Sequence, residues 1–142
     1  MLKIAIASDH GGFDLKEKIR NEYKNKEVDF IDFGTFPHDS VDYPDVAEKI
    51  IEPILSGLYD LGVLICGTGV GISIAANRHK GIRAAILYDD YVAQMAKEHN
   101  NANIVVFGGR TMSYDDVARR LDIFLSAKFQ GGRHQNRIEK LG

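Results

Sequence analysis

The chain of 142 residues contains a single cysteine, and its opposite charges nearly cancel, with 18 Lys and Arg against 20 Asp and Glu. One cysteine cannot form an intrachain disulfide, which is typical of proteins from a reducing cytosol. The net charge of −2 gives no overall positive field for nucleic acid or for a membrane surface. We therefore expect a cytoplasmic protein with no nucleic-acid partner and no membrane partner.

Long apolar runs, internal repeats and low-complexity segments are also lacking. The opening stretch, MLKIAIASDH, holds too short an apolar run for a signal peptide or a membrane span. No linker divides the chain, and its length suits one domain with a substantial core. We predict a single domain over residues 1–142 that ends in a basic segment over 131–142.

Five short apolar runs are present, and their nearly continuous hydrophobicity is typical of buried parallel strands. They cover residues 3–8, 28–34, 62–67, 82–89 and 103–109, and the second alternates as an edge strand does. Helical spacing occurs in four groups: Leu15, Ile19 and Tyr23; Val46, Ile50 and Leu55; Tyr91, Met95 and His99; Val117, Leu121 and Leu125. Pro53 is expected to kink or end the second of these helices. The alternation predicts a Rossmann-like, doubly wound α/β fold: a five-stranded parallel sheet in the order 2-1-3-4-5, with helices on both faces.

Two polar stretches follow the first and third predicted strands: SDHGG at 8–12 and CGTGVG at 66–71. In doubly wound sheets, ligands bind beyond the carboxyl ends of the strands, where the strand order reverses. A glycine-rich turn that leads into a helix also exposes N–H groups to a negatively charged oxygen. These stretches are therefore the first candidates for a binding site.

Nucleotide binding is a competing interpretation of the glycine turn. A Walker loop is excluded because no Gly-Lys-Ser/Thr is present. The dinucleotide pattern needs a third glycine or alanine where Ile72 stands, although Asp89 lies about where a ribose-binding acid would. A nucleotide- or sugar-phosphate-binding module without catalysis therefore stays open.

The lone cysteine, Cys66, begins the glycine turn. A lone cysteine is normally a small buried side chain, but this one also fits a catalytic base, because the amino end of a helix favours a thiolate. Enolisation beside a carbonyl requires both a base and N–H groups that stabilise the enediolate oxygen. The sequence offers both in six residues.

Other polar residues also have two interpretations. Asp9 and His10 could cap the next helix or face a ligand, and His99 could stabilise a helix end or belong to a site. Arg133 and Arg137 lie four apart, which suits phosphate binding from one helical face, although a basic tail can simply be solvated. No pair of His or carboxylate residues has metal-ligand spacing, so we expect no metal.

Eight motifs span almost the whole chain in one order: SDHGG, DFGT, DYPD, CGTGVGISIAANR, GIRAA, EHN, FGGR and FQGGRHQNR. Together they closely resemble the ribose-5-phosphate isomerase B family. The resemblance implies interconversion of D-ribose 5-phosphate and D-ribulose 5-phosphate by a homodimer or tetramer. It also implies that no metal and no organic cofactor takes part.

The resemblance further implies roles for the matching residues. Cys66 would move a proton between C1 and C2 through a cis-enediolate, while His99, assisted by Asp9, would open the furanose ring. The amides of residues 67–71 and the Thr68 hydroxyl would stabilise the oxyanion. The implied substrate contacts are Gly67, Thr68, Gly69, Val70 and Gly71 at the turn, Tyr43 and Asn100 at the sugar hydroxyls, and His10, Arg110, Arg133 and Arg137 at the phosphate.

Two departures within this family bear on the chemistry. Some members carry a glutamate after the glycine turn as the base and lack the cysteine, whereas GISIAA has no carboxylate here, so Cys66 is the only candidate. Galactose-6-phosphate isomerase subunits resemble the chain through CGTGVG but lack the intact GGRHQNR tail that this chain has. Isomerisation of a six-carbon sugar phosphate, allose or galactose 6-phosphate, is the alternative activity.

The predicted topology implies a site shared between subunits. Asp9, His10 and Cys66 follow strands, whereas His99 and Asn100 close a helix and lie at the opposite rim of the sheet. A helix of about ten residues is roughly 15 Å long, more than one side chain can cross. If His99 opens the ring that Cys66 isomerises, it must come from another chain.

Overall fold

The computed structural model describes residues 1–34 and 40–142, so Thr35 of the DFGT motif lies outside the described residues. The strands are β1 (Leu2–Ser8), β2 (Val28–Asp32), β3 (Leu61–Cys66), β4 (Ala84–Ile86) and β5 (Ile104–Gly108). The helices are η1 (His10–Gly12, a 3₁₀ turn), α1 (Phe13–Glu22), α2 (Tyr43–Leu55), α3 (Val70–Asn77), α4 (Asp90–Glu98), α5 (Tyr114–Ser126) and α6 (Arg133–Leu141).

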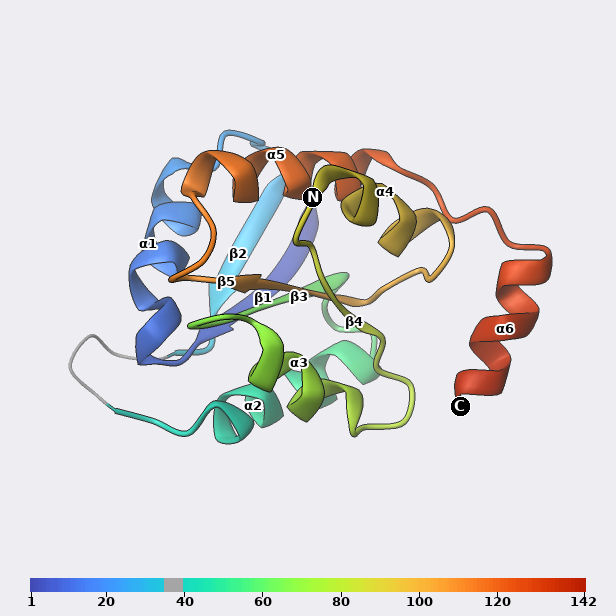
Figure 1. The fold of residues 1–142 in the computed structure, drawn as a ribbon, viewed down its shortest axis with the longest axis horizontal. Coiled ribbons are helices and arrows are strands. Elements are labelled where there is room, and N and C mark those ends of the chain that lie inside the picture. The colour runs from blue at the N-terminus through green and yellow to red at the C-terminus, as the bar shows by residue number, and fades with distance from the viewer. Residues whose placement is uncertain (35–39) are drawn as a thin grey trace.

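These strands form one parallel sheet in the order β2-β1-β3-β5-β4. Helices α1, α4 and α5 cover one face, α2 and α3 cover the other, and α6 stands apart from both layers on the β4 side (Figure 1). The doubly wound α/β fold is therefore confirmed, and so is the edge position of the second strand. In the described part of the chain, no helix has the length and apolar character needed to cross a membrane.

The predicted order 2-1-3-4-5 is wrong for the last two strands. β5 pairs with β3 along its whole length, from Gly62↔Ile104 to Cys66↔Gly108, and β4 pairs with the far side of β5. Every residue of β5 is buried, whereas β4 has three residues and all are half-buried. A central strand must be covered on both faces, and the larger apolar side chains of β5 meet this need better than Ala84 and Ala85. The observed strand order places the residues after β5 directly beside Cys66.

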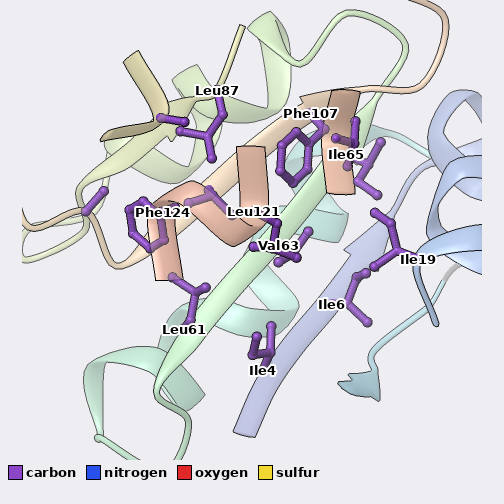
Figure 2. Close-up of a cluster of buried hydrophobic side chains, with 14 of the residues drawn as sticks. Ile4, Ile6, Ile19, Leu61, Val63, Ile65, Leu87, Phe107, Leu121 and Phe124 are labelled. Carbon is purple, nitrogen blue, oxygen red and sulfur yellow. The ribbon is translucent and has the colours of Figure 1, made fainter. Parts of the chain in front are cut away.

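Two hydrophobic clusters hold the layers together. Figure 2 shows the cluster under α1, α4 and α5, where Ile6, Val63 and Phe107 of the sheet have no exposed surface. The second cluster, under α2 and α3, includes Cys66 and Ile72. The glycine turn is therefore anchored in the core on both sides, by Cys66 before it and by Ile72 after it.

The predicted helix faces are partly wrong. At the end of α2 the buried residue is Ile54 rather than Leu55, which is 45% exposed, because a step of nine residues from Val46 leads to the opposite side of a helix. The helix ends two residues after Pro53. In α4 the small side chains of buried alanines face the core, and Tyr91 is 68% exposed.

Candidate active site

The loops after β1, β3 and β5 lie side by side at the carboxyl ends of the strands. The N–H of Gly109 donates to the carbonyl oxygen of Cys66 at 2.8 Å, and the N–H of Arg110 donates to that of Gly67 at 2.9 Å. The register also pairs Ser8, just before Asp9, with Ile65. Ten predicted site residues lie at this rim and are called the carboxyl-rim group: Asp9, His10, Tyr43, Cys66, Gly67, Thr68, Gly69, Val70, Gly71 and Arg110.

The Cys66 side chain is held by the turn that follows it. The N–H of Gly69 donates to Cys66 Sγ at 3.2 Å, and the cysteine is 5% exposed. Gly69 has a φ of 84°, and a Cβ there would lie 3.2 Å from Val106 Cγ1, so glycine suits this position best. An N–H donor stabilises a charged acceptor more strongly than a neutral one. The turn therefore places a backbone donor directly at this sulfur.

The same turn presents free N–H groups. Those of Gly67, Thr68 and Gly71 make no hydrogen bond within residues 1–34 and 40–142, whereas the N–H of Val70 donates to Thr68 Oγ1 at 3.2 Å. The turn leads into α3, whose dipole favours negative charge at its amino end. The arrangement can therefore stabilise an oxyanion beside the thiol.

Tyr43, Asp9 and His10 border the turn. A Cβ at Gly71 would lie 2.8 Å from the Tyr43 ring, so the ring packs directly on this glycine. Asp9 Oδ1 accepts from the N–H groups of Gly11 and Gly12 at 2.9 and 3.2 Å, which confirms the capping interpretation of Asp9. His10 Nδ1 accepts from the N–H of residue 41 at 3.4 Å. These contacts fix side chains of both the β1 loop and α2 next to the glycine turn.

Four other predicted site residues lie at the opposite rim and, with His134, form the amino-rim group: His99, Asn100, Arg133, His134 and Arg137. His99 follows the last residue of α4, where the chain turns toward the amino ends of β3 and β5. The Asn103 carbonyl oxygen there accepts from the N–H of Gly62 at 3.0 Å. The His134 ring stacks on the His99 ring, with centroids 4.1 Å apart and planes 11° from parallel.

The two groups lie at opposite ends of β3. Cys66 lies four residues along β3 from Gly62, which corresponds to about 13 Å. His99 belongs to the Gly62 end, and its ring is engaged by α6. One copy of the chain therefore does not bring His99 to Cys66.

His134 was not among the site residues predicted from the sequence. It is the one residue of α6 with a buried side chain, at 6% exposure. Burial lowers the pKa of His134 below its ordinary value of 6.5, and the neighbouring charges of His99, Arg133 and Arg137 lower it further. Its position between the two arginines of GGRHQNR was the available signal.

Asp89, the candidate ribose-binding acid, lies at the start of α4. Asp89 Oδ1 accepts from the N–H of Val92 at 2.7 Å, so this acid caps α4, which accounts for its position without a ribose. Among the residues that the structure describes, no group of three or more His, Cys, Asp or Glu side chains is arranged to hold a metal ion.

Known proteins resemble the whole chain. A family model described as Ribose/Galactose Isomerase matches residues 4–141. Ribose-5-phosphate isomerase B of Escherichia coli K12 is 43% identical over 141 residues, which cover 99% of this chain and 95% of that protein.

Solved structures of ribose 5-phosphate isomerases also resemble the whole chain. A ribose 5-phosphate isomerase from Thermotoga maritima is 51% identical with a TM-score of 0.95. A type B ribose 5-phosphate isomerase from Trypanosoma brucei is 39% identical with a TM-score of 0.94. Each comparison covers 99% of this chain and 97% of the other. The chain therefore belongs to the ribose/galactose isomerase family.

Proposed function

We propose that this protein is an aldose–ketose isomerase that interconverts D-ribose 5-phosphate and D-ribulose 5-phosphate. The observation that carries the proposal is a buried thiol that accepts an N–H bond from a glycine turn, three of whose other N–H groups have no partner in the part of the chain that the structure describes. A base beside an oxyanion hole is what enolisation requires. Family membership supports a sugar phosphate as the substrate.

The proposed reaction is a proton transfer with Cys66 as the base. The thiolate takes the proton from C2 of the open-chain aldose, and the C1 oxygen becomes the enediolate oxygen, held by N–H groups of Gly67, Thr68 and Gly71. The thiol then returns the proton to C1, while the hydroxyl proton moves from O2 to O1. Hydrogen and electrons stay within the sugar, so the step needs no redox partner.

We further propose a homo-oligomer with composite sites. The carboxyl-rim group of one subunit would meet the amino-rim group of its partner, in two equivalent sites related by a two-fold axis. His99 stacks on His134, which lies between Arg133 and Arg137 in the sequence, so the partner subunit would supply all four of these residues. Arg110 would come from the same subunit as Cys66. The lone thiol and the absence of an intrachain disulfide support a cytoplasmic location.

The proposed function is tested by incubating the protein with D-ribose 5-phosphate and measuring D-ribulose 5-phosphate. Allose 6-phosphate and galactose 6-phosphate are assayed in parallel, and the highest kcat/KM identifies the preferred substrate. Ribose 5-phosphate is expected to be preferred. A higher kcat/KM for a six-carbon sugar phosphate would favour the alternative, and binding without turnover of any of them would favour a non-catalytic module.

Loss of Arg137 should weaken substrate binding more than it slows the chemistry. A charge-assisted hydrogen bond contributes about 1.5–3 kcal/mol, so Arg137→Ala should raise KM for ribose 5-phosphate about ten- to a hundredfold. Lys140→Ala removes the same charge from the same exposed helix and should leave KM unchanged. Unphosphorylated ribose should be a poor substrate for both variants. Equal use of ribose and ribose 5-phosphate by the unmodified protein would contradict the phosphate role.

Removal of metal ions should leave the rate unchanged. The proposed mechanism obtains proton transfer and oxyanion stabilisation from protein groups, so it needs no polarising cation. The test is the rate after prolonged dialysis against EDTA. A loss of activity that one divalent ion restores would contradict it.

A further inference from the structure

Helix α6 has an unusual attachment. It lies apart from the two layers that cover the sheet (Figure 1), and His134 is its one buried side chain. The segment before it is tied to α4, because Gln130 donates through its N–H to the Glu98 carbonyl oxygen at 3.0 Å and through Nε2 to Glu98 Oε1 at 2.8 Å. At the far end, the N–H of Gly81 donates to the Gly142 carbonyl oxygen at 3.2 Å.

The stacked pair sets where the arginines lie relative to His99. A nine-residue helix with little apolar surface is marginal on its own, so its orientation depends on its contacts. Within the helix the main buried contact is the stack of His134 on His99. Arg133 and Arg137 flank His134 along the sequence and are exposed, so they follow any movement of its ring.

We propose that His134 is a positioning residue for the isomerase reaction: by stacking on His99 it fixes α6, and with it Arg133 and Arg137, at the distance from His99 that the sugar phosphate requires. The inference rests on the proposed function. His134 acts through His99 and the arginines, because the stack joins α6, which carries the arginines, to the end of α4, which is followed by His99.

Electrostatics explain why the stacked ring must be neutral. Two imidazolium rings 4.1 Å apart would repel each other. His134 faces His99 from α4 and Arg133 and Arg137 from its own helix, and the nearby carboxylate of Glu98 is engaged by Gln94 and Gln130. Burial and these cations lower the pKa of His134. The ring is therefore neutral at physiological pH, and the stack persists there.

Two substitutions of His134, one that removes the ring and one that keeps an aromatic ring, test whether stacking positions the arginines. His134→Ala removes the ring and should raise both KM for ribose 5-phosphate and the inhibition constant of inorganic phosphate about ten- to a hundredfold, because small displacements of positioning groups have effects of this size. His134→Phe keeps a stacking ring and should restore both constants to near the unmodified values. Gln135→Ala, an exposed neighbour on the same helix, is the control and should behave as the unmodified protein.

The two alternatives give distinct results. A lower Tm for His134→Ala with unchanged KM and unchanged phosphate inhibition would assign His134 a structural role only and overturn the proposal. Failure of His134→Phe to restore both constants would also overturn it. Amide hydrogen exchange of α6 supplies a readout without activity: protection should fall in the Ala variant and return in the Phe variant. If the unmodified protein does not isomerise ribose 5-phosphate, the proposed function fails, and exchange still tests the docking.

The stack should also weaken in acid. Folding lowers the pKa of His134 below 6.5, so its contribution to stability is present above that pH and is lost as the pH falls through the folded-state pKa. His134→Phe does not titrate. The Tm of the unmodified protein relative to this variant should therefore fall between about pH 7.5 and pH 5.5. A constant Tm difference over this range would contradict a neutral stacked histidine.

Discussion

Replacing Cys66 with Ala is expected to lower kcat by about two to four orders of magnitude, the usual contribution of a positioned general base. The base would be absent, while the turn that presents the N–H groups would remain. Phosphate binding should survive, because the substitution removes none of the predicted phosphate contacts. The measurement is steady-state kcat with ribose 5-phosphate, together with the inhibition constant of inorganic phosphate.

Cys66→Ser is the matched control for the hydrogen bond. A serine hydroxyl can still accept from the N–H of Gly69, but it is not ionised at neutral pH, so this variant should be nearly as inactive as Cys66→Ala. Because Cys66 is the only thiol, alkylation should also inactivate the protein, and substrate should slow the inactivation. Near-normal turnover in either variant would show that another group is the base.

Mixing two inactive variants should restore activity if the sites are composite. Cys66→Ala and His99→Ala damage different groups, so a mixed dimer would have one intact site and one doubly damaged site. Unfolding the variants together and refolding them should therefore return about a quarter of normal activity, since half of the dimers are mixed and half of their sites are intact. Each variant refolded alone should stay nearly inactive.

A second pair of variants provides the control for this experiment. Arg137→Ala and His99→Ala damage the same amino-rim group, so their mixed dimer has no intact site and should show no gain at low substrate concentration. Cys66→Ala mixed with Arg137→Ala should gain activity. If mixed dimers form and Cys66→Ala with His99→Ala still recovers nothing, His99 acts within its own chain.

The sequence by itself determined the parts of the candidate site that are close along the chain. Cys66 and Gly69 are three residues apart, and the glycines at 67 and 69 allow the turn that directs an N–H at the sulfur. Asp9 likewise reaches Gly11 and Gly12 through a local cap. Such contacts depend on covalent spacing and backbone freedom, both of which can be read from the residues.

The order of the sheet could not be obtained in this way. The runs at 82–89 and 103–109 are both apolar, and each alone suits a buried strand. Their order depends on which strand is better covered once α3, α4 and α5 have packed, and β5 takes the central place. Arg110 lies beside Gly67 only because of that choice.

The stack of His134 on His99 is the other feature that only the tertiary structure decided. The two histidines are 35 residues apart in the sequence, and neither shows a pattern that requires a partner. The motif order predicted that both rims carry site residues, because parallel strands fix which loops share a rim. Which side chains meet across the space between α4 and α6 depends on how whole elements bury their surfaces, and short-range spacing carries no information about that.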